Sequence, residues 1–131
     1  MKTIKHLIAV SLIVLLSSCG SITKFPTSNI TPAAEIVAKT KTDKNKNTVI
    51  EVIAKNLASA DRLSPPKNNY VVWITTDDNG TKNIGQLNIK NGSKAVLKTS
   101  TPFTVKDIYI TAEESGSISY PTGVEISRTS F

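Results

Sequence analysis

The segment that decides the fold is YVVWITT at residues 70–76, the most apolar of the strand-like runs in the chain. The turn sequence DDNG follows it directly at residues 77–80. β-Branched and aromatic residues favour extended backbone, and a glycine permits the positive φ angles that tight turns use. We therefore predict that residues 70–76 form a central strand. Because successive side chains of a strand point to opposite faces, Tyr70 and Trp73 are expected on opposite faces, with Trp73 and Val71 facing the core.

On both sides of this strand the chain has the same character. Short β-branched runs alternate in polarity between turn signals, and no window has the periodicity of an amphipathic helix. Asn91-Gly92, between two such runs, is a strong hairpin signal. The spacing predicts an all-β fold, an immunoglobulin-like antiparallel β-sandwich of about seven strands without the cysteine pair of true immunoglobulin domains. The other predicted strands span residues 33–42, 48–55, 83–89, 94–98, 105–112 and 124–129.

The N-terminus has the three parts of a secretory signal. Lys2 and Lys5 precede an apolar run at residues 7–16, and the segment LSSC follows at residues 16–19. The run is shorter than the roughly 20 residues that span a bilayer. Residues 16–19 resemble the lipobox of bacterial lipoproteins, in which the cysteine is acylated. We expect residues 1–18 to be a signal peptide and Cys19 to carry the lipid; the alternative is an ordinary signal with an incidental cysteine.

The segment after Cys19 is predicted to be a flexible tether. Residues 20–32 are rich in Ser, Thr and Pro, which disfavour a helix or a central strand. The lipidated Cys19 and this tether would then occupy 19–32, and the β-sandwich domain would occupy 33–131. Gly20 stands where an Asp is associated with retention in the inner membrane. We therefore expect a membrane-anchored lipoprotein of the cell envelope, in the outer membrane and facing the periplasm.

Composition excludes several function classes for the processed chain. The only histidine of the full sequence is His6, which lies in the predicted signal peptide, and the only cysteine is Cys19, the predicted lipidation site. A Cys/His metal site or a His-based catalytic triad therefore cannot be built within one processed chain. The formal charge of +6 includes Lys2 and Lys5, and the basic residues are not interleaved with aromatic ones. We expect no cofactor, no metal, no catalytic residue and no nucleic-acid partner.

A pattern of motifs resembles the extracytoplasmic C-terminal domain of anti-sigma-K factors. It consists of Tyr70-x-x-Trp73, a later Ile-Gly85-x-Leu, Thr-x-Glu113, and a Gly-rich loop that closes in Pro121-Thr-Gly123. The resemblance covers most of residues 33–131 and implies a sandwich outside the cytoplasmic membrane. It implies structural roles for these six positions, and for Glu113 hydrogen bonds from loop amides near Gly116. A sensor or docking role would follow only by analogy.

Several polar clusters have both a functional and a structural interpretation. Glu113-Glu114 are adjacent, so in a strand they point to opposite faces and do not form an acid–base pair. Residues 77–80 lack the alternating ligands of a calcium loop and are interpreted as a turn. Lys39, Lys41, Lys44 and Lys46 form a basic hairpin, which protects a sheet edge or, as the alternative, contacts the membrane. The predicted interaction loop contains Ser115, Ser117, Ser119 and Tyr120.

The sequence therefore predicts a non-enzymatic, lipid-anchored module of the cell envelope. Its partners would be the membrane, through the N-terminal lipid, and an unidentified envelope protein or ligand. An envelope-polymer hydrolase is the alternative from another class, although the processed sequence has no His, no free thiol and no convergent carboxylates. A purely structural envelope lipoprotein is the third possibility.

Overall fold

The segment at residues 70–76 is central, as predicted. The computed structural model describes residues 20–91 and 94–131, and in it β4 (Asn69–Thr76) pairs with a strand on each side. The resulting four-stranded antiparallel sheet has the order β5-β4-β8-β9. Its other members are β5 (Thr81–Gln86), β8 (Val105–Glu113) and β9 (Glu125–Ser130). Cys19 and the predicted signal peptide at 1–18 lie outside the described residues.

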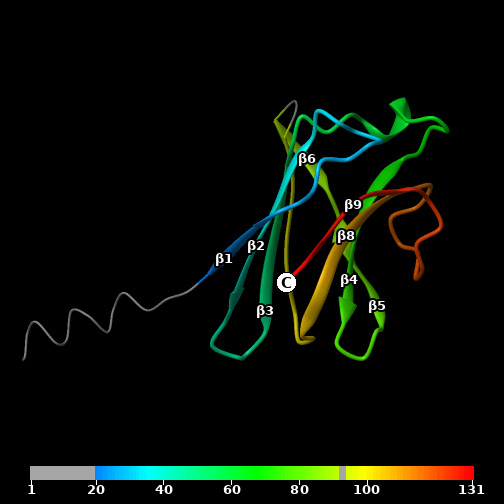
Figure 1. Cartoon of the computed structure of the whole chain (residues 1–131). Coiled ribbons are helices and arrows are strands. Elements are labelled where there is room, and N and C mark those ends of the chain that lie inside the picture. Colours follow the sequence, from blue (N-terminus) through cyan, green and yellow to red (C-terminus); the bar gives the residue numbers. More distant parts are fainter. Residues whose placement is uncertain (1–19, 92–93) are drawn as a thin grey trace, which may run out of the picture.

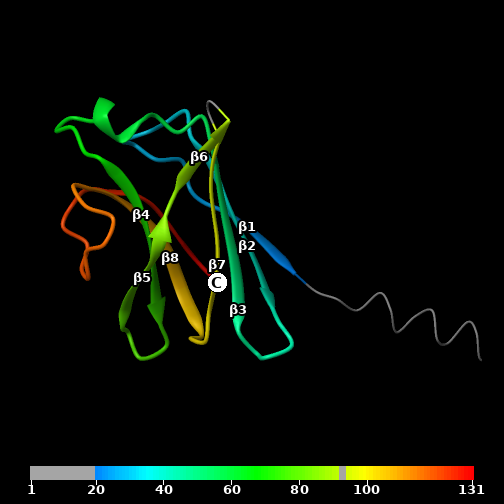
Figure 2. The same ribbon diagram turned by 180° about the vertical axis from the view of Figure 1, so that it is seen from behind.

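A second, five-stranded antiparallel sheet packs against the first (Figure 1, Figure 2). Its order is β1-β2-β3-β7-β6, and a short 3₁₀ helix, η1 (Ala60–Arg62), lies on the connection from β3 to β4. The described residues thus form nine strands in two layers, which confirms the all-β sandwich. The strands of the second sheet are β1 (Ser21–Lys24), β2 (Glu35–Thr42), β3 (Thr48–Lys55), β7 (Lys94–Thr101) and β6 (Asn88–Asn91).

The strand order is that of an immunoglobulin-like fold. Strands β2-β3-β7-β6 take the places of A-B-E-D, and β5-β4-β8-β9 take the places of C′-C-F-G. The predicted single strand at 83–89 is wrong in one respect, because the chain changes sheets within it. β5 ends at Gln86, Leu87 still donates its N–H to the carbonyl oxygen of Tyr70, and β6 begins in the opposite sheet at Asn88. The Asn91-Gly92 turn includes residues outside the described part.

The main core lies between the sheets, and Tyr70 rather than Trp73 faces it. β3 contributes Ile50, Val52 and Ala54, as their alternation predicts, and β4 contributes Tyr70, Val72 and Ile74; all six are buried. Trp73 is also fully buried, but on the outer face of the four-stranded sheet, where it forms a second cluster with Val71 and Tyr109. The prediction that Trp73 faces the core is therefore wrong. Tyr70, near the start of β4, occupies the core face, and its hydroxyl donates to the Ala58 carbonyl oxygen.

The predicted tether is also wrong, because residues 21–34 belong to the sandwich. β1 pairs along its whole length with β2, and Phe25 is buried in the main core. The Ser127 hydroxyl donates to the Pro26 carbonyl oxygen at 2.8 Å and joins this segment to β9. The prolines and hydroxyl residues indicated the absence of a helix correctly, but a four-residue edge strand is too short to show a polarity pattern. Within the described residues no helix is long and apolar enough to cross a membrane.

Candidate functional site

The loop between β8 and β9 covers part of the outer face of the four-stranded sheet. In Figure 1 it is the orange segment on the side of the molecule away from β2 and β3. Its Ile118 packs on the outer cluster of Val71, Trp73 and Tyr109. The Trp73 and Tyr109 rings stack with centroids 6.3 Å apart, and the Arg128 guanidinium lies 3.9 Å from the Tyr109 centroid. This loop therefore rests on a continuous aromatic surface.

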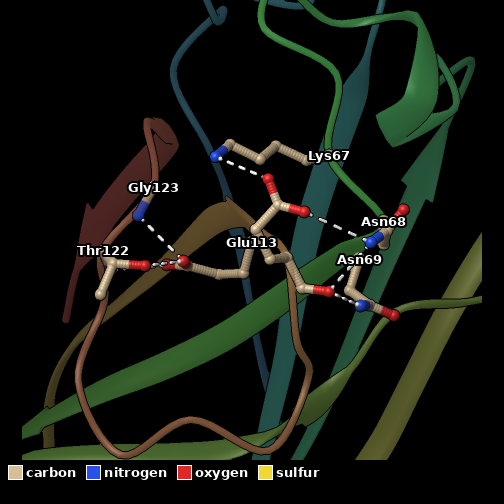
Figure 3. Close-up of polar contacts among 7 residues, drawn as sticks. Lys67, Asn68, Asn69, Glu113, Thr122 and Gly123 are labelled. Carbon is tan, nitrogen blue, oxygen red and sulfur yellow. Dashed lines mark hydrogen bonds and ion pairs between the residues drawn. The ribbon is translucent and has the colours of Figure 1, made fainter.

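Glu113, the last residue of β8, fixes the end of the loop. Its side chain is fully buried, and Figure 3 shows it pointing at Thr122 and Gly123. The backbone N–H groups of Thr122 and Gly123 donate to its two carboxylate oxygens at 3.0 and 2.9 Å, and the Thr122 hydroxyl donates at 2.7 Å. The sequence placed the amide donors near Gly116, whereas the structure places them six and seven residues further along the chain.

A fourth hydrogen bond links Glu113 to the tryptophan. The Trp73 indole N–H donates to the Thr111 hydroxyl at 2.8 Å, and that hydroxyl donates to Glu113 at 2.6 Å. Burial alone would raise the pKa of Glu113, but the hydrogen bonds from the two threonines and Gly123 outweigh burial and lower this pKa below its ordinary value. The buried carboxylate is therefore held in its charged form without a cationic partner among the groups that bond to it.

Two of the motif positions require glycine, each for a different physical reason. A methyl group on Gly123 would lie 1.7 Å from the Ala112 carbonyl oxygen, so close approach of two backbones requires glycine there. Gly85 has a φ of 134°, beside an irregularity in the pairing of β4 with β5. Glycine is required there because other residues rarely adopt this backbone conformation. Pro121, half-buried, precedes the anchored residues and restricts the backbone before Thr122.

Asn83 of β5 holds the first part of the loop, at Gly116 and Ile118. This residue was not among those predicted from the sequence. Its amide nitrogen donates to the carbonyl oxygens of Gly116 and Ile118, each at 2.9 Å, and its oxygen accepts from the Gly85 N–H. An asparagine in an alternating strand has no pattern that marks it, and only the approach of the loop gives it this role. Thr111 and Thr122 lie within the quoted motifs, but the sequence assigned neither of them a role.

Glu114 binds a different segment from Glu113, the connection before β4 and the first residue of β4, whose Lys67, Asn68 and Asn69 are labelled in Figure 3. Its carboxylate accepts from Lys67 at 3.2 Å, and its carbonyl oxygen accepts from the side-chain amides of Asn68 and Asn69 at 3.2 and 3.1 Å. The adjacent glutamates thus bind two different segments, in keeping with the prediction that they do not act as a pair.

The predicted interaction residues all lie on the exposed part of this loop. Ser115, Ser117 and Ser119 are exposed, and Tyr120 has 73% of its surface exposed. Ser117, Ser119 and Tyr120 line a shallow hollow of about 530 Å³ together with residues 81–83 of β5, while Ser115 lies outside it. The serine and threonine hydroxyl groups of the hollow and the Tyr120 ring suit hydrogen bonding and stacking rather than proton transfer. Lys82 also lines the hollow, but its Nζ lies 5.1 Å from the centroid of the Phe103 ring.

The other acidic cluster is a turn. Residues 77–80 connect β4 to β5, the Thr76 N–H donates to the Gly80 carbonyl oxygen at 2.9 Å, and the Thr76 hydroxyl donates to the Asp78 carboxylate. This hydrogen bond is the main reason why the pKa of Asp78 is lowered. In the part of the chain that the structure describes, no group of three His, Cys, Asp or Glu side chains could hold a metal ion.

The sequence matches no protein-family model, no curated protein and no solved structure. The likeness to the anti-sigma-K extracytoplasmic domain therefore remains a prediction from the quoted motifs. The candidate site consists of the Ser115–Tyr120 loop on its two anchors, Glu113 and Asn83.

Proposed function

We propose that this protein is a lipid-anchored, non-enzymatic interaction module of the cell envelope. The β-sandwich presents the Ser115–Tyr120 loop to an envelope protein or ligand, and the lipid on Cys19 holds the domain at the membrane. The motif resemblance supports a common ancestry with the extracytoplasmic domain of anti-sigma-K factors. The proposed location is the periplasmic face of the outer membrane.

The observation that carries the binding role is the contrast between a fixed loop base and an exposed tip. Glu113 and Asn83 together fix the backbone at both ends of the loop through five hydrogen bonds from or to loop residues. Tyr120, a large amphipathic side chain, is nevertheless 73% exposed. Ordering a mobile segment opposes binding, so a loop that is already fixed loses less entropy when a partner binds. Tyrosines with few rotatable bonds are enriched at interfaces for the same reason.

The anchoring role is supported by the leader pattern at residues 2–16 and the LSSC segment at 16–19. It is tested by metabolic labelling with radioactive palmitate in cells that express the chain or its Cys19→Ser variant. We expect label and membrane fractionation for the parent chain and loss of label in the variant. Equal labelling of both chains would overturn the assignment of Cys19.

The binding role is tested by placing a photo-cross-linking amino acid at position 120 in the full chain. The matched control carries it at Asn45, which is also exposed, in the turn between β2 and β3. We expect a discrete adduct from position 120 that an excess of unlabelled parent chain competes away and an excess of the Tyr120→Ala variant does not.

Two results would contradict the proposal. The same adducts from both positions, or adducts that resist competition, would indicate nonspecific proximity rather than a binding loop. Turnover of an envelope polymer by the purified chain would instead support the hydrolase alternative.

A further inference from the structure

The outer face of the five-stranded sheet carries an excess of positive charge in the described residues. The pairing register turns alternate residues of β1, β2, β3 and β7 outward, because their neighbours Ala38, Ile50, Val52 and Ala95 face the core. Among the outward residues are two glutamates, Glu35 and Glu51. There are six lysines: Lys24, Lys39, Lys41, Lys55, Lys94 and Lys98. We call this surface the basic face.

Its centre is apolar. Val37, Ile53 and Val96 lie directly opposite one another on three neighbouring strands and are each partly exposed. Beside them Ile22 of β1 has 70% of its surface exposed and lines a shallow hollow of about 320 Å³ with Val49. Aliphatic side chains surrounded by lysines form an amphipathic surface, on which the lysine stems can lie along the apolar centre while their ammonium groups reach outward.

The outer face of the four-stranded sheet carries no such excess of positive charge in the described residues. Its Arg128 pairs with Glu125 at 2.9 Å and with Asp107 at 3.8 Å, and its Glu113 is buried. A negatively charged planar surface would therefore attract the five-stranded side.

The lysines of β2 do not protect a sheet edge. β1 pairs with β2 along all four of its residues, so β2 lies inside the sheet and the edge-protection interpretation of Lys39 and Lys41 is wrong. Lys39 makes only a loose ion pair with Glu51, at 4.0 Å. The presence of these lysines on an interior strand needs another explanation, and the position of Gly20 provides one.

Gly20 lies at the border of the basic face, beside the Thr40 carbonyl oxygen and the Cβ of Lys41. Since residues 21–34 are part of the sandwich, no tether separates the domain from Cys19, which is bonded directly to Gly20. One residue spans at most about 3.6 Å. A lipid on Cys19 would therefore hold this border of the basic face at the bilayer surface.

We propose that the basic face lies flat against a bilayer that contains anionic lipids. This proposal rests on the lipid anchor of the proposed function, and adds the orientation of the domain and the class of lipid. The Ser115–Tyr120 loop, on the opposite layer, then points away from the membrane (Figure 1). The lysines supply attraction to lipid head groups, while Ile22 and Val49 contact the acyl boundary.

The experiment uses the lipidated full chain, purified from membranes and reconstituted in phosphatidylcholine vesicles with or without phosphatidylglycerol. A fluorophore is attached to Ser100→Cys on the basic face or, as the matched control, to Ser119→Cys on the loop; both serines are exposed. A head-group nitroxide lipid quenches fluorophores that touch the surface. We expect strong quenching at position 100 in phosphatidylglycerol vesicles, little in pure phosphatidylcholine, and little at position 119 in either.

Charge variants make the test quantitative. A lysine beside an anionic surface changes the docked-to-undocked ratio about fivefold, so Lys41→Gln with Lys98→Gln is expected to lower this ratio about twenty-five-fold. Arg62→Gln with Lys106→Gln removes the same charge from η1 and the other sheet and is expected to leave the ratio unchanged. Salt at about 1 M, where the Debye length is about 3 Å, is expected to abolish the quenching at position 100.

The outcomes are distinguishable. Vesicle-bound protein with equal quenching at positions 100 and 119, or quenching that ignores phosphatidylglycerol and salt, overturns the orientation but leaves the lipid anchor standing. If the fluorescence at position 100 depends on protein density rather than on lipid charge, two copies pair through this face. This result also overturns the proposed orientation. Protein that stays in the supernatant overturns both the anchor and the orientation.

Discussion

Replacing Glu113 with glutamine tests a buried side chain that accepts four hydrogen bonds. The substitution keeps the size of the side chain but exchanges one carboxylate oxygen for an NH₂ group. One oxygen of Glu113 accepts from Thr111 and the Thr122 N–H, and the other accepts from the Thr122 hydroxyl and the Gly123 N–H. Each oxygen thus receives a backbone N–H, so in either amide orientation one backbone donor faces another donor. Hydroxyl groups can rotate to compensate, but a backbone N–H cannot.

The magnitude follows from these contacts. A buried N–H left without an acceptor costs roughly 1–3 kcal/mol, and the remaining bonds lose the strengthening that the charge gives them. We expect the free energy of unfolding to fall by about 3 kcal/mol, which is a large part of the roughly 5–15 kcal/mol of a typical domain. At about 4 °C per kcal/mol for a domain of this size, the melting temperature should fall by about 12 °C.

The assay is urea and thermal unfolding followed by circular dichroism, together with hydrogen exchange at the amides of Thr122 and Gly123. Glu114→Gln is the matched control, because the Glu114 side chain is 68% exposed and its pair with Lys67 lies at the surface. It should cost less than about 1 kcal/mol. If Glu113→Gln destabilised the protein no more than this control, or left both amides protected, the role of Glu113 as the anchor of the loop would be refuted.

The same group gives a pH dependence with a definite sign. The pKa of Glu113 is lowered from its ordinary value of 4.5, so the folded protein favours the carboxylate more than the unfolded chain does. Its contribution to stability is therefore complete above pH 4.5 and is lost as the pH falls below that value, through the folded-state pKa. The difference in unfolding free energy between the parent chain and Glu113→Gln should be constant near neutral pH and shrink in acid. A difference that grew in acid would contradict this assignment.

Three other variants test individual contacts. Gly123→Ala places a methyl group 1.7 Å from a backbone carbonyl oxygen and should cost about 3 kcal/mol in urea unfolding, whereas Gly116→Ala meets only a side chain that can move and should cost less. Burial, followed by the nearby Asp61 carboxylate, raises the pKa of Tyr70 to about 12, so the free energy of unfolding should decline between pH 10 and 12. Tyr70→Phe should lower the free energy of unfolding by about 1 kcal/mol at neutral pH and abolish that decline. Tyr120→Ala should change the melting temperature by less than about 2 °C, since this side chain is exposed, and a larger fall would indicate a structural role.

The strand pattern was readable because alternation and turn chemistry act locally. Ile50, Val52 and Ala54 alternate with polar or partly exposed neighbours, and all three are in the core as their spacing predicts. The pattern failed where backbone geometry interrupts the period. A pairing irregularity at Ile110 and Thr111 shifts the register of β9, so Val124 is exposed while Ile126 is buried, although the sequence predicted one face for both.

The candidate loop was predicted, but its supports were not. Ser115, Ser117, Ser119 and Tyr120 are exposed residues of one polar segment, which sequence shows directly. Asn83 lies more than thirty positions earlier, and only the folding of the loop across β5 brings its amide to Gly116 and Ile118. Contacts between segments so far apart leave no periodic signal in one sequence.

The central strand at 70–76 shows which features the sequence determines and which only the tertiary structure determines. Its β-branched and aromatic residues determined by themselves that this segment is an extended central strand, because that preference arises from the residues and their immediate neighbours. Which face Trp73 occupies was decided only in three dimensions, since both faces of β4 are buried and polarity cannot distinguish them. The β8–β9 loop covers the outer face with Ile118, and the Thr111 hydroxyl accepts the indole N–H, which requires a partner when it is buried. These two contacts make the outer face suitable for Trp73.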